Sequence, residues 1–261
     1  MIRGALGSRY GIQGALGRSV KRAAATAFAP TDISGCNLWI DFSDADTLFT
    51  DAGSTKVSSD GDAIYRANDK SGNNNHLNQA TSSKRPLYKT NIKNGLSVSR
   101  YDTTDDKLML TNPIDLLTGS TMFFISQTSS SSFPRGVFGA DGKANTQWRY
   151  TNSTTLGFAQ TGAPGMNFYW PNIVAANLTL FSFRLQPSPQ VLECYANGQN
   201  KYTDNSWTAT SCWITMCGDS YEGQHCLGGD ISEWIIYNSF LSDNDRDAVT
   251  TYLNNKWAIY S

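Results

Sequence analysis

Apolar and polar residues alternate in short runs along most of the chain, which is the pattern of β-strands. In residues 36–42, CNLWIDF, every second residue from Leu38 to Phe42 is apolar and faces the same side of a strand. Similar runs recur between turn sequences such as Asn197-Gly198. The predicted strands are residues 36–42, 96–101, 107–110, 121–127, 147–151, 178–185, 191–197, 212–217 and 230–238. Many short strands joined by turns indicate an all-β, two-sheet antiparallel jelly-roll sandwich.

Residues 242–257 have a helical pattern instead. Ser242 is a suitable N-cap, and the carboxylates of Asp243 and Asp245 favour the positive end of the helix dipole. We therefore expect a C-terminal helix whose apolar side packs on the sandwich. The apolar residues that recur at helical spacing are Ala248, Val249, Tyr252, Leu253 and Trp257.

Composition and charge narrow the possible partners of the domain. Of 261 residues, 39% are hydrophobic and only 16% are charged, with a formal net charge of -1. This charge provides no overall attraction to nucleic acid or to an anionic membrane. No run approaches the about 20 apolar residues of a membrane-spanning helix. We expect neither nucleic acid nor a membrane as a partner.

Residues 1–31 differ from the rest of the chain. The repeat GALGSRYGIQGALG begins at Gly4, and five basic residues precede the first acid, Asp32. Glycines and arginines interrupt every apolar run, so the apolar core of a secretory signal is missing, and an organelle transit peptide is the alternative. Such a segment cannot bury enough surface to fold alone, so we predict an extended arm that orders on a partner. The residues expected to dock are Leu6, Arg9, Tyr10, Ile12, Leu16, Arg18, Lys21 and Arg22.

The cysteines and histidines do not form a recognisable metal site. The five cysteines lack the paired CxxC spacing of zinc sites, and a domain of this size does not need disulfides. We interpret them as buried thiols, with a disulfide as the alternative. His225 adjoins Cys226 but lacks a second pair of ligands, and His76 is expected to fix the loop that contains it.

Four segments together resemble one family. They are LWIDFSDADTLF, NDKSGNNNHLNQ, NGLSVSRYDTTDDKLML and GGDISEWIIYNSFLSDNDRDAVTTYLNNKWAI. In order and spacing they are similar to the laminin-G-like, concanavalin A-like jelly-roll domains of phage and bacterial surface proteins. The resemblance spans residues 33–261 and implies a two-sheet sandwich that binds glycans or proteins, or serves as a virion building block. It divides the chain into an arm, residues 1–31, and a jelly-roll domain, residues 33–261.

Catalytic motifs are missing from the sequence. The glucanases of this superfamily carry an E-x-D-x-x-E strand, whereas the three glutamates here, Glu193, Glu222 and Glu233, lie in separate segments. Gly218-Asp219-Ser220 resembles an esterase nucleophile motif but lacks the downstream Asp-x-x-His, so we interpret it as a turn. We expect no enzymatic activity, with a glycan-degrading enzyme as the least favoured alternative.

Two groups of residues are candidates for ligand binding. Aromatic rings in the loop-rich half could stack on sugars, and Trp170, beside Pro171, is expected to be exposed. Calcium needs about six to eight oxygen ligands, and the best candidates in the oxygen-rich loops are Asp69 and Asn73. No other cofactor is expected. The aromatic candidates are Trp148, Tyr169, Trp170, Trp207 and Tyr221.

The arm and the domain together suggest a function. We predict a non-enzymatic phage virion structural protein, a fibre, tail or capsid-decoration component. Its arm would attach to other virion proteins, and its jelly roll would be displayed on the surface as a homo-oligomer. The alternative is a lectin-like module that binds a host surface glycan.

Overall fold

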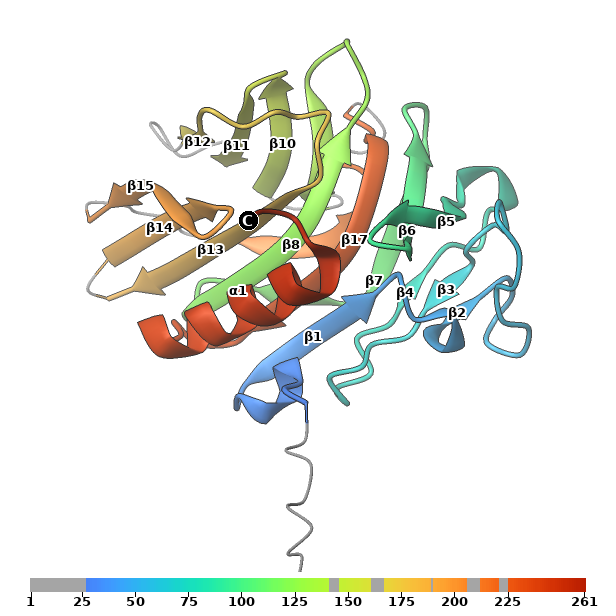
Figure 1. The fold of residues 1–261 in the computed structure, drawn as a ribbon, viewed down its shortest axis with the longest axis horizontal. Coiled ribbons are helices and arrows are strands. Elements are labelled where there is room, and N and C mark those ends of the chain that lie inside the picture. Colours follow the sequence, from blue (N-terminus) through green and yellow to red (C-terminus); the bar gives the residue numbers. More distant parts are fainter. Residues whose placement is uncertain (1–26, 141–145, 161–166, 189, 206–211, 221–224) are drawn as a thin grey trace, which may run out of the picture.

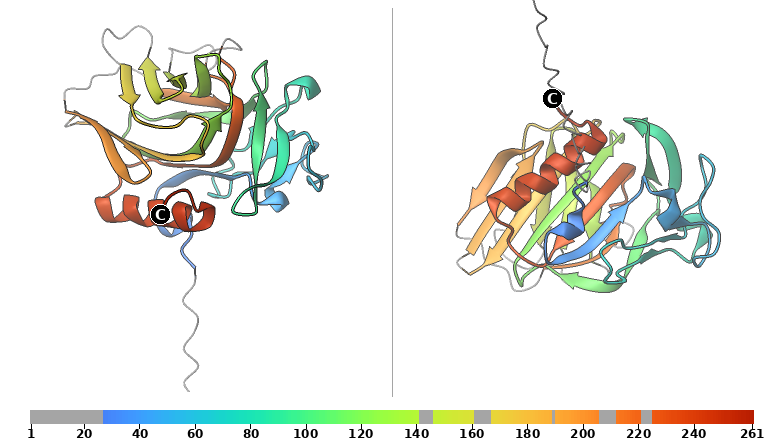
Figure 2. Two further views of the ribbon diagram at one scale, coloured as in Figure 1. Left: turned by 45° about the horizontal axis from the view of Figure 1, so that its top comes forward. Right: turned by 60° about the horizontal axis from the view of Figure 1, so that its bottom comes forward.

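Two antiparallel sheets pack face to face, and a helix covers the outer side of one of them (Figures 1 and 2). The computed structural model describes residues 27–140, 146–160, 167–188, 190–205, 212–220 and 225–261. The predicted fold class is confirmed, and every predicted strand overlaps an observed one. The residues predicted to dock, from Leu6 to Arg22, lie outside the described residues.

The first sheet has eight strands, and β17 is at its centre. Its order is β15 (Gln199–Asp204), β14 (Gln190–Ala196), β13 (Thr179–Pro187), β8 (Ser120–Thr128), β17 (Gly228–Tyr237), β6 (Leu96–Asp102) and β5 (Leu87–Lys93), with β1 (Cys36–Asp41) also paired to β17. All ten residues of β17 are buried, because one face meets the second sheet and the other meets the helix.

The second sheet has nine strands. Its order is β12 (Asn167–Trp170), β11 (Thr155–Gln160), β10 (Thr146–Asn152), β9 (Arg135–Gly139), β16 (Trp213–Cys217), β7 (Leu108–Asp115), β4 (Leu77–Asn78), β3 (Arg66–Ala67) and β2 (Leu48–Phe49). The described residues also contain three short 3-10 helices, η1 (Pro30–Asp32) before β1, and η2 (Ala45–Thr47) and η3 (Ser82–Lys84) in the connections. Neighbouring strands are often distant in sequence, as in a jelly roll.

Two hydrophobic cores lie on opposite faces of the first sheet. Leu38 and Ile40 of β1 point into the core between the sheets, where the ring of Phe138 lies 4.3 Å from that of Trp234. Trp39, between them in sequence, points into the core beneath the helix. The alternation of apolar residues in β1 therefore serves both cores, because successive side chains of a strand face opposite sides of its sheet.

The helix α1 (Asp243–Trp257) begins and packs as predicted. The Ser242 hydroxyl accepts a hydrogen bond from the backbone N–H of Asp245 at 3.2 Å. Val249, Leu253 and Trp257 are fully buried against the first sheet. Among the described residues, no helix is long and apolar enough to cross a membrane.

A buried ionic cluster joins α1 to the sheet. Glu233 of β17 is fully buried, and one of its carboxylate oxygens accepts hydrogen bonds from Lys256 Nζ and Trp257 Nε1, both at 2.7 Å. Its other oxygen accepts from Trp39 Nε1 at 2.8 Å and from the Tyr252 hydroxyl at 3.1 Å. Burial raises the pKa of Glu233, and the nearby carboxylate of Asp41 raises it further.

Asp41 completes this cluster from β1. Its carboxylate lies 2.7 Å from Lys256 Nζ and 3.1 Å from Lys70 Nζ. Burial acts to raise the pKa of Asp41, but the two ammonium groups outweigh burial and lower it. The two carboxylates therefore share one lysine, and this arrangement fixes the end of α1 over β1 and β17.

The start of the described chain also packs on this layer. The ring of Phe28 lies 5.8 Å from that of Tyr252, tilted by 56°, and Tyr237 donates a hydrogen bond to the Pro30 carbonyl at 2.8 Å. In Figures 1 and 2 this segment, in blue, lies beside α1, in red. The last residues of the predicted arm are therefore part of the folded body.

The cysteines are as predicted. All five have free thiols, and all but the half-buried Cys36 are buried. Burial raises the pKa of Cys217 and Cys226 to about 12, which keeps both thiols protonated and unreactive near neutral pH.

Candidate functional site: a polar hollow near the C-terminal tail

A polar hollow of about 360 Å³ opens at one edge of the sandwich. Three segments surround it: the β12–β13 connection, the β14–β15 turn and the tail after α1. Polar side chains dominate its lining, and Ile173, Val174, Leu178 and Ile259 add apolar surface. The polar side chains that line it are those of Asn172, Asn177, Thr179, Asn197, Gln199, Lys201, Tyr260 and Ser261.

A buried tryptophan anchors the first wall of the hollow, the β12–β13 connection. Trp170 ends β12 and is fully buried, with its ring 6.3 Å from that of Phe181. The chain then turns at Asn172, whose φ of 61° is in the left-handed region that asparagine tolerates. A hydrogen bond from the backbone N–H of Ile173 to the Thr154 carbonyl, at 3.1 Å, fixes the connection beyond the turn. The side chain of Asn172 is thus presented at the surface by an anchored backbone.

The second wall is a tight hairpin turn. Asn197 and Gly198 both have positive φ, 50° and 72°, as a two-residue β-hairpin requires. The Asn197 side chain accepts a hydrogen bond from the backbone N–H of Leu180 at 3.1 Å, and so ties the turn to β13. A Cβ at Gly198 would lie 2.9 Å from the Tyr260 hydroxyl, so glycine also allows the tail to approach.

The third wall is the tail after α1. Asn254 accepts hydrogen bonds from the backbone N–H groups of Ile259 and Tyr260 and donates one to the Tyr260 carbonyl, at 3.0 to 3.1 Å. Burial, with the nearby charge of Asp247, raises the pKa of Tyr260. Tyr260 therefore keeps its hydroxyl proton near neutral pH and can donate a hydrogen bond.

One exposed apolar side chain lines this hollow. Among the described residues, the large hydrophobic side chains that are exposed are those of Leu87, Tyr169 and Val174. Val174 lines the hollow and is 57% exposed, and Tyr169, five residues earlier, is 45% exposed. Amide and hydroxyl groups beside exposed apolar surface can recognise a small polar ligand that also has an apolar face.

The aromatic residues predicted to bind ligand are only partly at the surface. Tyr169 is exposed, but Trp148 and Trp170 are fully buried, so the prediction that Trp170 is exposed was wrong. Both tryptophans pack on Phe183 in the core between the sheets, at 5.6 and 6.4 Å between ring centroids. Trp207 and Tyr221 lie outside the described residues.

Asp69 and Asn73, the predicted calcium ligands, close a loop by hydrogen bonds. The Asp69 carboxylate accepts from the backbone N–H groups of Trp39, Ser71 and Asn75 and from the Ser71 hydroxyl. The Asn73 amide donates to the Cys36 carbonyl at 2.9 Å. Donors therefore already surround the Asp69 oxygens that a calcium ion would need.

His76 fixes this loop, as predicted. Its Nδ1 accepts a hydrogen bond from the backbone N–H of Asp69 at 3.0 Å. Burial and the charge of Arg66 lower the pKa of His76, so the imidazole is neutral, as this hydrogen bond requires.

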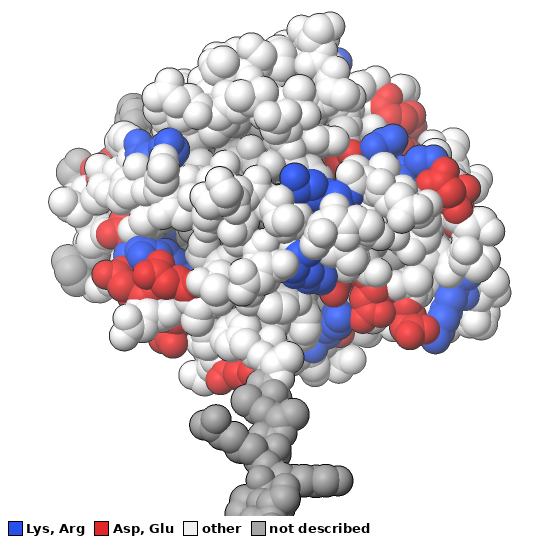
Figure 3. All heavy atoms as spheres, viewed as in Figure 1, with Lys and Arg blue, Asp and Glu red and all other residues white. Residues whose placement is uncertain are grey.

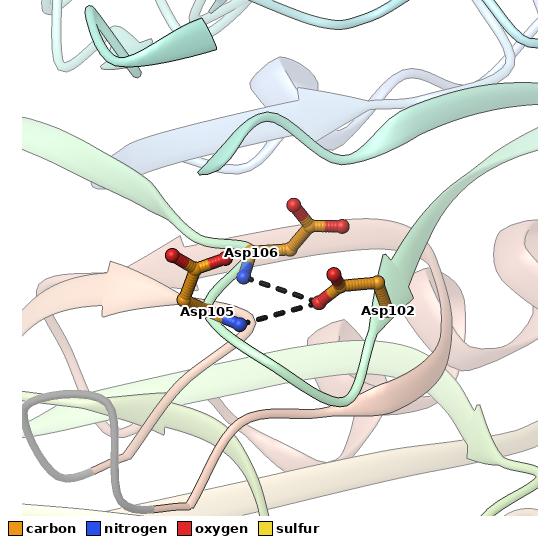
Figure 4. Close-up of side chains that lie close together, drawn as sticks. All are labelled: Asp102, Asp105 and Asp106. Carbon is orange, nitrogen blue, oxygen red and sulfur yellow. Dashed lines mark hydrogen bonds between the residues drawn. The ribbon is translucent and has the colours of Figure 1, made fainter. Parts of the chain in front are cut away.

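Three carboxylates converge in another loop, after β6 (Figure 4). The oxygens of Asp102, Asp105 and Asp106 lie within 4.8 Å of one another. Asp102 accepts hydrogen bonds from the backbone N–H groups of Asp105 and Asp106, at 3.2 and 3.4 Å. Burial and the charge of Asp102 raise the pKa of Asp106 to about 7. Calcium binding in this chain stays a prediction.

The Gly218-Asp219-Ser220 segment packs closely against β9. A Cβ on Gly139 would lie 2.5 Å from the Ser220 carbonyl oxygen, and one on Gly136 would collide with the Ser220 backbone. Asp219 also pairs with Cys226 in an isolated β-bridge. This segment is therefore held by close backbone packing against β9.

Charged side chains are distributed in pairs over the surface. Figure 3 shows one face on which basic and acidic groups mostly lie next to each other, with large areas that carry neither. The residues that line the polar hollow provide mainly amide and hydroxyl groups, and Lys201 is the one basic residue among them.

Comparison with solved structures finds domains of similar fold. No protein-family model and no curated protein sequence matches the chain. The fold is similar to domain 4 of an extracellular arabinanase from Geobacillus stearothermophilus, in complex with arabinotriose. The TM-score is 0.54 at 13% identity, over 82% of this chain and 97% of that one. The architecture is a jelly-roll-like sandwich.

Two toxin binding domains are also similar in fold. The binding domain of Paraclostridial Mosquitocidal Protein 1 has a TM-score of 0.60 at 10% identity over 87% of this chain. That of botulinum neurotoxin serotype D has a TM-score of 0.57 at 12% identity over 84%. The chain spans about half of each toxin domain, 54% and 51%. At these identities, the similarity concerns the fold alone.

Proposed function

We propose that this chain is a non-catalytic glycan-binding module and that its polar hollow contacts the sugar. The observation that carries the proposal is the composition of the hollow, in which Asn172, Asn177 and Gln199 present exposed amides beside the Tyr260 hydroxyl. Sugar hydroxyls pair with amides and hydroxyls, and the apolar face of a sugar ring packs on apolar side chains such as that of Val174.

The similarity in fold supports this proposal. Domain 4 of the arabinanase has a similar fold over most of its length and was solved with arabinotriose. A jelly roll hosts many functions, so this similarity raises the expectation of glycan binding without locating the site. The location rests on the hollow itself.

The positions of the glutamates support a non-catalytic role. Glycoside hydrolysis requires two carboxyl groups that flank the scissile bond. Glu233 is fully buried in the ionic cluster beneath α1, and Glu193 pairs with Arg184. Glu222 lies outside the described residues. Neither described glutamate is placed to reach a bound sugar in the hollow.

A glycan array tests the proposal, followed by calorimetric titration of a glycan that binds. Asn177→Ala and Gln199→Ala should each weaken binding about three- to tenfold, the effect of one lost hydrogen bond. Asn200→Ala is the matched control, because Asn200 is exposed on β15 and does not line the hollow. An array without binding, or equal affinities for all three variants, would contradict the proposal.

We further propose that the module is displayed on a phage virion as a homo-oligomer and is attached through residues 1–31. The supporting observation is the contrast between the five basic residues that precede Asp32 and the formal charge of -1 of the whole chain. Replacing Arg9, Arg18 and Arg22 by Glu should then reduce the copies bound per assembled particle. Unchanged stoichiometry would argue against attachment through this arm.

A further inference from the structure

Lys256 lies between two buried carboxylates. Its Nζ is 2.7 Å from an oxygen of Asp41 and 2.7 Å from an oxygen of Glu233. Asp41 comes from β1, Glu233 from β17 and Lys256 from the last turn of α1. The side chains of Asp41 and Glu233 are 5% and 0% exposed, and that of Lys256 is 19% exposed. An amine, a carboxyl group and a second carboxylate that can move protons are the groups needed to form an amide bond between side chains.

The surroundings of Lys256 exclude most water. The rings of Tyr252 and Trp257 flank it, with centroids 5.8 and 5.4 Å from Nζ. Trp257 Nε1 also donates a hydrogen bond, at 2.7 Å, to the Glu233 oxygen that faces Nζ and so holds this oxygen in place. Burial disfavours charged groups, so it brings the ion pair closer in free energy to a neutral amine beside a neutral acid. The neutral amine is the nucleophilic form.

The two oxygens of Asp41 have different partners. Oδ1 accepts hydrogen bonds from the Ser43 backbone N–H at 3.1 Å and from the Ser43 hydroxyl at 2.6 Å. Oδ2 faces Lys256, and Lys70 Nζ lies 3.1 Å from it. The two donors on Oδ1 would stabilise the negative charge that this oxygen gains when an amine attacks Cγ. Oδ2, beside two ammonium groups, is therefore the oxygen that would leave.

Lys70 is the competing amine at Asp41. Its Nζ also lies 2.6 Å from Asp44, whose side chain is 31% exposed. Burial acts to lower the pKa of Lys70, but the carboxylates of Asp41 and Asp44 outweigh burial and raise it, so this ammonium keeps its proton. Glu233 is the stronger base, because burial and the charge of Asp41 raise its pKa. Lys256, in contact with Glu233, is thus the amine that can be deprotonated.

We propose that Lys256 and Asp41 join in an amide bond, with Glu233 as the catalytic base and acid. Glu233 takes a proton from the Lys256 ammonium and passes it to Oδ2 of Asp41. Nζ then attacks Cγ and forms the C–N bond. Glu233 takes a second proton from the nitrogen and delivers it to the same oxygen, so that the Cγ–Oδ2 bond breaks and water leaves. One ammonium and one carboxylate are replaced by one amide and one water, without an oxidant or a co-reactant.

The fixed positions of these groups favour the condensation. Well-oriented groups within one molecule react as if present at about 10⁵ to 10⁸ M, which offsets the competition from bulk water. The bond would close a loop over residues 41–256 and tie β1 to α1, independently of what the polar hollow binds. A force that pulls on the chain before Asp41 and after Lys256 would then bypass all residues between them.

Mass spectrometry of the denatured full-length protein tests the proposal. The wild type should be lighter than its sequence by one water, about 18 Da. A tryptic digest should contain residues 23–56 joined to residues 247–261, because trypsin does not cleave after an acylated lysine. The exposed pair Lys56 and Asp46, also 2.7 Å apart, is the internal control and should stay unlinked. A wild-type mass without the loss of water would overturn the proposal.

Two variants assign the roles. Lys256→Arg keeps the positive charge but has no nucleophilic amine, so the loss of water should disappear. Glu233→Gln cannot accept the proton and should lower the cross-linked fraction at a fixed time by at least about tenfold. Lys56→Arg is the matched control and should retain the full loss of water.

Near-ultraviolet circular dichroism shows whether each variant is folded. Loss of water from folded Lys256→Arg would contradict the choice of amine, and unchanged cross-linking in folded Glu233→Gln would contradict the role of the glutamate. The mass of the wild type decides the existence of the bond whether or not the variants fold.

Discussion

Replacing Glu233 by alanine should remove the main connection between α1 and the sheet. The substitution deletes the acceptor for four hydrogen bonds, from Trp39, Tyr252, Lys256 and Trp257, at 2.7 to 3.1 Å. Lys256 keeps Asp41 at 2.7 Å, but the two indole N–H groups lose this acceptor. A buried donor without a partner costs about 1 to 3 kcal/mol, and breaking a buried ion pair about 3 to 5.

These costs overlap, so we expect Glu233→Ala to lower the free energy of unfolding by about 3 to 5 kcal/mol. Urea unfolding followed by tryptophan fluorescence measures it. With a slope of about 2 to 3 kcal/mol per molar urea, the midpoint should fall by about 1 to 2.5 M. Asp46→Ala is the control, because it removes an exposed pair with Lys56 and should leave the midpoint unchanged. A fall of less than about 0.3 M for Glu233→Ala would refute this account of the cluster.

Two further predictions concern pH. His76 has a lowered pKa, so its contribution to stability is complete above its ordinary value, about 6.5, and is lost as the pH falls through the lowered one. The urea midpoint of the wild type should therefore fall more on acidification than that of His76→Gln, and identical profiles would be contrary evidence. Asp106 has the opposite sign: its pKa is raised to about 7, so its contribution is complete below about 4 and is lost as the pH rises through 7. Asp106→Asn should gain in midpoint over the wild type between about pH 4 and pH 8, and a constant difference would show that Asp106 is not held neutral.

The sequence predicts best those elements whose side chains face a core. Residues 230–238 combine Ile231 with the apolar run 234–237, and β17 occupies Gly228–Tyr237. The helix follows from its cap and apolar spacing, and α1 is Asp243–Trp257. In both, the hydrophobic pattern and local turn chemistry agree, which makes the local sequence a reliable guide.

Edge strands and glycine-rich strands are missed for a physical reason. β15, Gln199–Asp204, is at the edge of its sheet and is mostly polar, so it lacks an apolar alternation. β9, Arg135–Gly139, contains two glycines, Gly136 and Gly139, and glycine in a short segment argues against a strand. Close packing against Ser220 requires them, and that contact joins residues distant in sequence.

The candidate site is beyond local prediction for a similar reason. The hollow brings together Asn172, Gln199 and Tyr260, from three separate segments. The burial of Trp170 depends on which face of β12 meets the opposite sheet, and the neighbouring Pro171 suggested exposure instead. The sequence nevertheless singled out Tyr169, which is exposed.

The position of β17 between two cores has a consequence for biosynthesis. Of the described strands it is the last to be made, yet it pairs with β8, β6 and β1, which precede it by about a hundred residues or more. Until the ribosome releases Gly228–Tyr237, neither the core between the sheets nor the core beneath α1 can close. Until then the nascent chain exposes unpaired strands of two unfinished sheets, which could pair with other chains. A chaperone that binds exposed strands would be needed until this strand emerges.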